Sequence, residues 1–75
     1  MPAFNKGDQV QWNYRRAAVT GTVQDVYTSP VTREDVKNYP NKRNASEKNP
    51  AYLIEKEDGT HFLKSESELY DLSEE

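Results

Sequence analysis

The chain has 75 residues, no cysteine, one histidine and a formal net charge of −3. A chain this short holds one hydrophobic core, so we expect a single domain over residues 1–75. The composition excludes disulfides, thiolate zinc sites and histidine metal clusters, so we expect no metal and no cofactor. It has no apolar run long enough to cross a bilayer and no signal peptide, which predicts a cytoplasmic protein without membrane contact.

Residues 9–14, QVQWNY, alternate polar and apolar side chains. Strict alternation predicts a strand with one buried face. Val10 and Trp12 share that face, so we expect the Trp12 indole in the core. Tyr14 has the same parity but stands at the end of the strand, next to two arginines. We therefore expect Tyr14 at the rim of the fold.

Residues 17–27, AAVTGTVQDVY, are rich in valine and threonine and predict a second strand. Val23 and Val26 have opposite parities, so the apolar pattern slips by one between them. A β-bulge produces such a slip, and bulges bend sheets into small barrels. Gly21 suits close backbone approach at the bend. After the slip, Tyr27 is expected to point outward.

Residues 28–50 form the longest polar stretch and contain three prolines. We expect a long polar loop inserted between the second and third strands. Thr32 and Asp35 could cap one helical turn before Pro40. The stretch is either a mobile insertion or a segment that contributes to function.

Residues 51–64, AYLIEKEDGTHFLK, predict a hairpin, because two apolar runs flank Asp58-Gly59. This dipeptide favours a two-residue type I′ turn. Such a turn places Ile54 opposite Leu63.

The predicted pairing gives the hairpin two apolar faces. The larger face comprises Tyr52, Ile54 and Leu63. Leu53 and Phe62 form a smaller patch on the other side. We expect a chain end, through Phe4 or through Leu69 and Leu72, to cover this patch. A weak homodimer through the same patch is the alternative, so the chain is expected to be a monomer or a weak homodimer.

Ser65 and Glu68 have the spacing of a capping box, and Leu69 could begin a last strand. Four strong strands, a fifth at the C-terminal end, a bulge and no sustained helix predict an all-β fold. We expect a small SH3-like barrel of about five antiparallel strands.

Catalysis has little support in the sequence. A catalytic triad needs a histidine beside a nucleophile, and His61 is the only histidine in the chain. It follows a tight turn, where we expect it to be exposed and a poor general base. The three glycines form no phosphate-binding loop. We expect a non-enzymatic binding module.

Aromatic side chains at the barrel rim are the best candidates for contact with a partner. We expect an unknown protein or peptide to bind Tyr14, Tyr27 and Tyr52 together with Arg15 and Arg16. The contacts would be apolar and cation–π in kind.

Nucleic acid is the alternative partner. Residues 1–29 and 30–50 carry charges of +1 and +2, whereas residues 51–75 carry −6. The acidic last third disfavours binding to phosphates. A local basic cluster could still bind them, and its candidate residues are Arg15, Arg16, Lys42 and Arg43.

The stretches KGDQVQWNY, VTGTVQDVYT and NASEKNPAYLIEKEDGTHFLKSESELYDL resemble the hypervirulence-associated protein Tudor domain family. The resemblance covers the chain outside residues 30–43 and implies an SH3-like, Tudor-type barrel. It also places Tyr14 where methyl-reading Tudor domains have an aromatic cage residue. The other cage positions fall at Val19, Glu55, Asp58 and Thr60, so one aromatic wall is retained.

Overall fold

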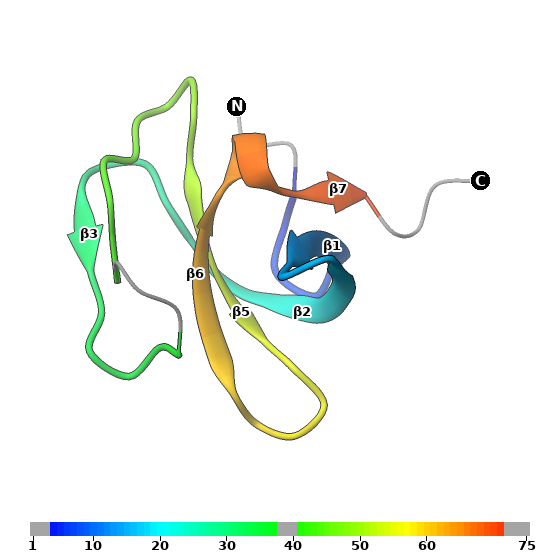
Figure 1. Ribbon diagram of the computed structural model, residues 1–75. Coiled ribbons are helices and arrows are strands. Elements are labelled where there is room, and N and C mark those ends of the chain that lie inside the picture. Colours follow the sequence, from blue (N-terminus) through cyan, green and yellow to red (C-terminus); the bar gives the residue numbers. More distant parts are fainter. Residues whose placement is uncertain (1–3, 38–40, 72–75) are drawn as a thin grey trace.

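The computed structural model describes residues 4–37 and 41–71, which form seven strands and one 3₁₀ turn. The strands are β1 (Gln9–Tyr14), β2 (Ala17–Tyr27), β3 (Val31–Thr32), β4 (Lys42–Arg43), β5 (Ala51–Glu55), β6 (His61–Ser65) and β7 (Tyr70–Asp71). The 3₁₀ turn η1 (Glu66–Glu68) lies between β6 and β7 (Figure 1). Within these residues no helix has the length and apolar character that a membrane span requires.

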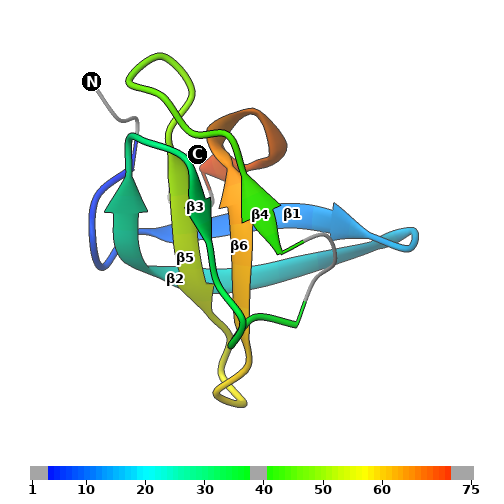
Figure 2. The same cartoon turned by 90° about the vertical axis from the view of Figure 1, so that its left-hand side faces the viewer.

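Five strands form one curled antiparallel sheet in the order β6-β5-β2-β1-β7. The long strand β2 belongs to both halves of the curl, because its first part pairs with β1 and its later part with β5. The register of the β2–β5 pairing shifts between Val23 and Asp25, where the sequence predicts a bulge. Figure 2 shows the result, with β1 and the start of β2 crossing β5 and β6 steeply. The predicted all-β, SH3-like barrel is confirmed.

The main core lies inside this curl. Its buried members are Phe4, Val10, Trp12, Val23, Tyr52, Ile54, Phe62 and Leu69. Trp12 is 1% exposed, so its predicted place in the core is confirmed. Its indole Nε1 is buried and has no hydrogen-bond partner among the described residues. The Phe62 ring is tilted against the indole at a centroid distance of 5.2 Å.

The β5–β6 hairpin differs from the predicted two-residue turn. Lys56 N donates to Thr60 O at 2.8 Å, which leaves three residues in the loop. Gly59 has a φ of +87°, as in the three-residue loop that pairs a type I turn with a left-handed glycine. The longer loop shifts the register by one residue, so Ile54 faces Phe62 instead of Leu63.

This shift exchanges the predicted faces of the hairpin. Phe62 joins Ile54 in the main core, whereas Leu53 lies opposite Leu63 on the other face. Phe4 and Leu69 also pack in the main core, and Leu72 lies outside the described residues. The proposed dimer patch is not exposed, because Leu53 is 6% and Phe62 5% exposed.

The segment between β2 and β5 covers the second face of the hairpin. Strands β3 and β4 pair into a two-stranded sheet beside β5 and β6 (Figure 1). A second apolar cluster lies beneath it and comprises Ala45, Ala51 and Leu63 with Tyr27, Val31 and Val36. Lys37 N donates to His61 O at 2.7 Å, so the segment also contacts the edge of β6. Residues 32–37 form no helical turn, and residues 38–40 lie outside the described part.

Candidate functional site

The turn between β1 and β2 consists of Arg15 and Arg16. Tyr14 pairs with Ala17, so these two arginines are the whole connection. Their φ angles are +52° and +69°. A two-residue hairpin turn with positive φ at both positions is type I′. The hairpin projects beyond the rest of the described molecule in Figure 2.

Arginine is a poor residue for this backbone conformation. Asn-Gly is the preferred pair in type I′ turns, because a β-carbon in the left-handed region crowds the neighbouring carbonyl. The crowding costs roughly 1–2 kcal/mol per residue. Backbone strain of this kind clusters at functional sites. Arg15 and Arg16 therefore mark the turn as a candidate site.

Tyr14 and Phe62 form a pair of rings between two cations. The Arg15 guanidinium carbon lies 5.4 Å from the Tyr14 ring centroid. Tyr14 meets Phe62 edge-on at 6.3 Å between centroids, and Lys56 Nζ lies 6.0 Å from the Phe62 centroid. Tyr14 is 40% exposed above the buried Phe62. We call Tyr14, Arg15, Arg16 and Lys56 the hairpin-tip patch.

The two turn arginines are available to a ligand. Within residues 4–37 and 41–71, neither Arg15 nor Arg16 has an ion pair or a side-chain hydrogen bond, and both are exposed. The ion pairs of the described chain lie elsewhere, as in Arg33 with Asp35 at 2.6 Å. The Arg33 hydrogen bond holds the pKa of the Asp35 carboxyl below its ordinary value. The two turn arginines thus present positive charge that no carboxylate of the described residues pairs with, on an acidic protein.

Tyr52, predicted to contact a partner, is 0% exposed and cannot form part of a contact surface in this fold. Its hydroxyl donates to Glu66 Oε1 at 2.9 Å and accepts from the Phe4 amide at 3.3 Å. Tyr27 is half-buried beside the second apolar cluster, where its hydroxyl accepts from Arg33 at 2.7 Å. Of the three predicted tyrosines, Tyr14 alone adjoins the turn arginines.

The four basic residues of the nucleic-acid alternative lie in two places. Lys42 and Arg43 form β4, on the far side of β5 and β6 from the β1–β2 hairpin (Figure 1). Arg43 Nε donates to Glu68 Oε1 at 3.0 Å. The fold does not gather them with Arg15 and Arg16 into one basic surface.

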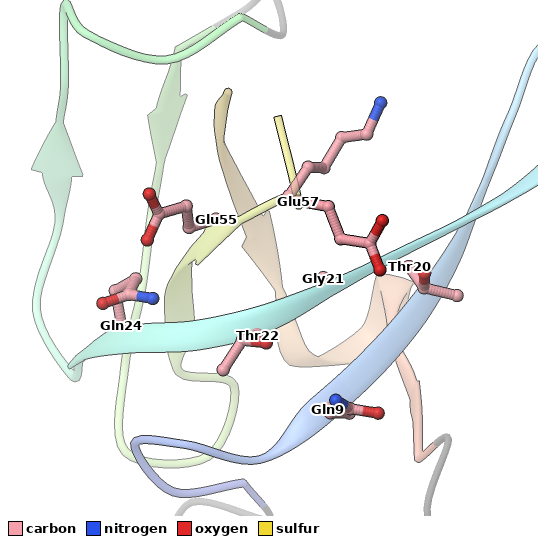
Figure 3. Close-up of a pocket in the computed structure, with 8 residues that line it drawn as sticks. Gln9, Thr20, Gly21, Thr22, Gln24, Glu55 and Glu57 are labelled. Carbon is pink, nitrogen blue, oxygen red and sulfur yellow. The ribbon is translucent and has the colours of Figure 1, made fainter. Parts of the chain in front are cut away.

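A shallow polar hollow of about 400 Å³ lies on the outer face of β1, β2 and β5 (Figure 3). Its lining comprises Gln9, Thr20, Gly21, Thr22, Gln24, Glu55, Lys56 and Glu57. A neighbouring hollow is lined by Ala18, Val19, Thr20, Lys56, Glu57 and Asp58. This second hollow includes the expected cage positions Val19 and Asp58, and no aromatic side chain lines it. Among the described residues, no group of three His, Cys, Asp or Glu could hold a metal ion.

Two further side chains, which the sequence did not point to, reach the surface. Lys56 was not among the predicted site residues, and its position over the Phe62 ring depends on the longer turn. Tyr70, 58% exposed, lies on β7 opposite Gln11. Neither position had a signal in the sequence beyond residue type, because Lys56 depends on the register of its own hairpin and Tyr70 on the pairing of β7 with the distant β1.

A curled five-stranded sheet in this order, with a 3₁₀ turn before its last strand, defines a small SH3-like barrel of the Tudor type. A family model described as "Hypervirulence associated proteins TUDOR domain" matches residues 7–69, and the chain belongs to this family. Searches of curated proteins and of solved structures found no match. Tudor domains are small binding modules for proteins or peptides and are generally not catalytic.

Proposed function

We propose that the domain binds an acidic segment of a partner protein through the hairpin-tip patch. The observation that carries the proposal is the type I′ turn built from Arg15 and Arg16. The fold alone would be served better by Asn-Gly, so the arginine side chains have a use that outweighs the backbone strain.

The chemistry of the patch fits carboxylates. A guanidinium presents a planar fork that binds a carboxylate through two parallel hydrogen bonds. Among the described residues, Arg15 and Arg16 are exposed and have no carboxylate partner to lose when a ligand binds, and the contact of Arg15 with the Tyr14 ring leaves its N–H groups free to donate. Tyr14 adds a half-exposed ring beside them, held in place by its edge contact with Phe62. Lys56 lies over the Phe62 ring on the other side of this ring pair, but Glu57 and Asp58 adjoin it, so the charge available to a ligand is that of the two arginines.

Phosphates of nucleic acid share this chemistry, but the arrangement favours a protein ligand. The second basic pair, Lys42 and Arg43, lies away from the tip, and Arg43 is engaged by Glu68. The patch therefore offers few cations for a nucleic-acid backbone, whose affinity depends on many.

The test is a titration of the amide NMR spectrum with three probes. These are a blocked peptide of alternating glutamate and threonine, its lysine–threonine counterpart, and a single-stranded oligouridine. We expect shifts at Tyr14, Arg15 and Arg16 with the acidic peptide and none with the basic one. The variant Arg15→Asn/Arg16→Gly keeps the turn type and removes both guanidiniums. It should weaken acidic-peptide binding about tenfold or more, because hydrogen bonds to charged groups are lost.

A matched control, Lys42→Asn/Lys48→Asn, removes the same charge away from the tip. It should bind the acidic peptide as the wild type does. Equal weakening in both double variants would mean that only net charge matters, and it would overturn the proposal. Oligouridine binding that exceeds peptide binding and falls steeply with salt would assign the surface to nucleic acid instead.

A further inference from the structure

We infer that the acidic segment binds in extended form, as a strand added to the edge of β1 beside Asn13. This inference rests on the proposed function and specifies how its ligand is held. It follows from the directions of the β1 backbone groups and from the short length of β7.

The register of the hairpin fixes those directions. In a type I′ turn, the residues flanking the two-residue loop are joined by the turn hydrogen bond, which here links Tyr14 and Ala17. Opposed residues of an antiparallel pair alternate between bonded and non-bonded pairs. Asn13 and Ala18 are therefore a non-bonded pair, and the Asn13 N–H and C=O point away from β2.

The same alternation holds along the rest of the strand. Val23 N donates to Asp8 O at 2.8 Å, so Asp8, which has the parity of Tyr14, faces β2. Gln11 has the parity of Asn13 and pairs with Tyr70 of β7, on the side of β1 that faces away from β2. The outer edge of β1 is thus a hydrogen-bonding edge that β7 already uses.

Strand β7 uses only part of this edge. It pairs with Val10 and Gln11, and the chain before Tyr70 turns inward at the buried Leu69. Asn13 is exposed and has no strand partner on that side among the described residues. An unpaired strand edge of this kind accepts an extended peptide.

The adjacent charges select the ligand. Arg15 and Arg16 follow this edge directly, so a strand placed beside Asn13 runs past both guanidiniums. Backbone hydrogen bonds to Asn13 then supply general affinity, and glutamate or aspartate side chains supply specificity. A second copy of this chain is disfavoured as the added strand, because its own β7 already pairs with Val10 and Gln11 and leaves it the same short stretch of edge.

The test uses Asn13→Pro, with Asn13→Val as its matched control. Proline is tolerated at an edge position whose N–H faces outward, so this change removes one outward donor and leaves the β1–β2 ladder intact. Valine changes the side chain and keeps the N–H. We expect Asn13→Pro to weaken binding of the glutamate–threonine peptide about five- to tenfold, which is the effect of one ordinary hydrogen bond, and Asn13→Val to bind as the wild type does.

Two further measurements keep the test sharp. Hydrogen exchange of the Asn13 amide in the wild type should slow when the peptide is added. A copy of the peptide N-methylated at alternate residues should bind at least about fivefold more weakly than its parent, since it cannot donate.

Equal binding by the proline and valine variants, with an unprotected Asn13 amide, would overturn strand addition while leaving arginine-dependent binding intact. Protection of Asn13 without peptide, growing with protein concentration, would show a second copy on this edge and would also overturn it. Loss of arginine dependence, by contrast, would remove the proposed function itself.

Discussion

Gly21 packs against Ile54 so closely that a β-carbon at position 21 would lie 2.5 Å from Ile54 Cγ2. The same β-carbon would lie 3.1 Å from the Glu55 carbonyl oxygen. Ile54 is fully buried, so it has no free space into which to move. The absence of a side chain at Gly21 is therefore what lets β2 pass over β5 at the bend of the sheet.

Gly21→Ala should destabilise the fold by about 1–3 kcal/mol, the usual cost of overpacking a core. Urea unfolding would measure the change. Thr20→Ala, at the exposed neighbouring position, should stay within about 0.5 kcal/mol of the wild type. An unchanged midpoint for Gly21→Ala would show that the close approach is not maintained in solution.

Arg15→Asn/Arg16→Gly should raise the free energy of unfolding by about 1–3 kcal/mol, because it relieves two left-handed arginines. Thermal unfolding gives the readout. The same variant is expected to lose peptide affinity, so stability and binding should change in opposite directions. A variant less stable than the wild type would contradict the strain on which the proposed site depends.

Tyr52→Phe removes a buried hydroxyl that joins the Phe4 amide to Glu66. We expect a loss of about 1–3 kcal/mol in stability, because the Phe4 amide loses its acceptor. Binding of the acidic peptide should be unchanged, since Tyr52 has no exposed surface. Denaturant unfolding and the peptide titration measure the two effects separately, and weaker binding by the folded variant would restore Tyr52 to the contact surface.

Stability should decline in acid partly through Glu68. Burial alone would raise the pKa of this carboxyl, but hydrogen bonds from the Ser65 amide and the Arg43 guanidinium outweigh burial and hold it below its ordinary value. A carboxyl whose folded pKa is depressed contributes stability above its unfolded pKa, and that contribution is lost as the pH falls through the folded pKa.

Glu68→Gln should therefore flatten the fall in unfolding free energy below about pH 4.5. Glutamine keeps an acceptor for the Ser65 amide, so the local turn is preserved. Denaturant midpoints measured between neutral and acidic pH would show the slope. The control Glu47→Gln, at an exposed position, should follow the wild-type curve. An identical curve for Glu68→Gln would show that Glu68 does not contribute to the loss of stability in acid.

Trp12, the only tryptophan, should emit at short wavelength and resist quenching by iodide. It is 1% exposed, and no described residue forms a hydrogen bond with its Nε1, so we expect little stabilisation of its excited state by water or polar groups. Steady-state fluorescence with a tryptophan solution as reference is sufficient. Red-shifted, readily quenched emission would contradict the closed core.

The curl of the sheet was predictable because its causes are local. The alternation of Val10, Trp12 and Tyr14 and the parity slip between Val23 and Val26 both appear within a few residues of sequence. The register of the second hairpin was not, because Asp58-Gly59 suits a two-residue or a three-residue loop. What decides between them is the packing of Phe62 against Trp12, which lies 50 residues away in the sequence.

The candidate site was predicted in part for the same reason. Tyr14 and the two arginines are consecutive, so their proximity needed no tertiary information. Tyr52 was misplaced because a tyrosine at the start of a strand can bury or expose its hydroxyl, and its buried partners Phe4 and Glu66 come from other parts of the chain. The strain in the turn was invisible, since arginine pairs do not indicate a type I′ conformation.

The β3–β4 segment should protect the barrel against fibrous self-assembly, because it covers an edge and an apolar face of the sheet. The Lys37 amide donates a hydrogen bond to the His61 carbonyl at the edge of β6. The segment also covers the apolar face of the hairpin that carries Leu63. A variant that lacks this segment would expose the edge of β6 and the apolar face of the hairpin to neighbouring molecules. It should therefore precipitate as ordered aggregates. The segment between β2 and β5 should therefore limit aggregation at this edge, whereas at the other side of the sheet β7 covers Val10 and Gln11 and, among the described residues, no strand pairs with Asn13 there.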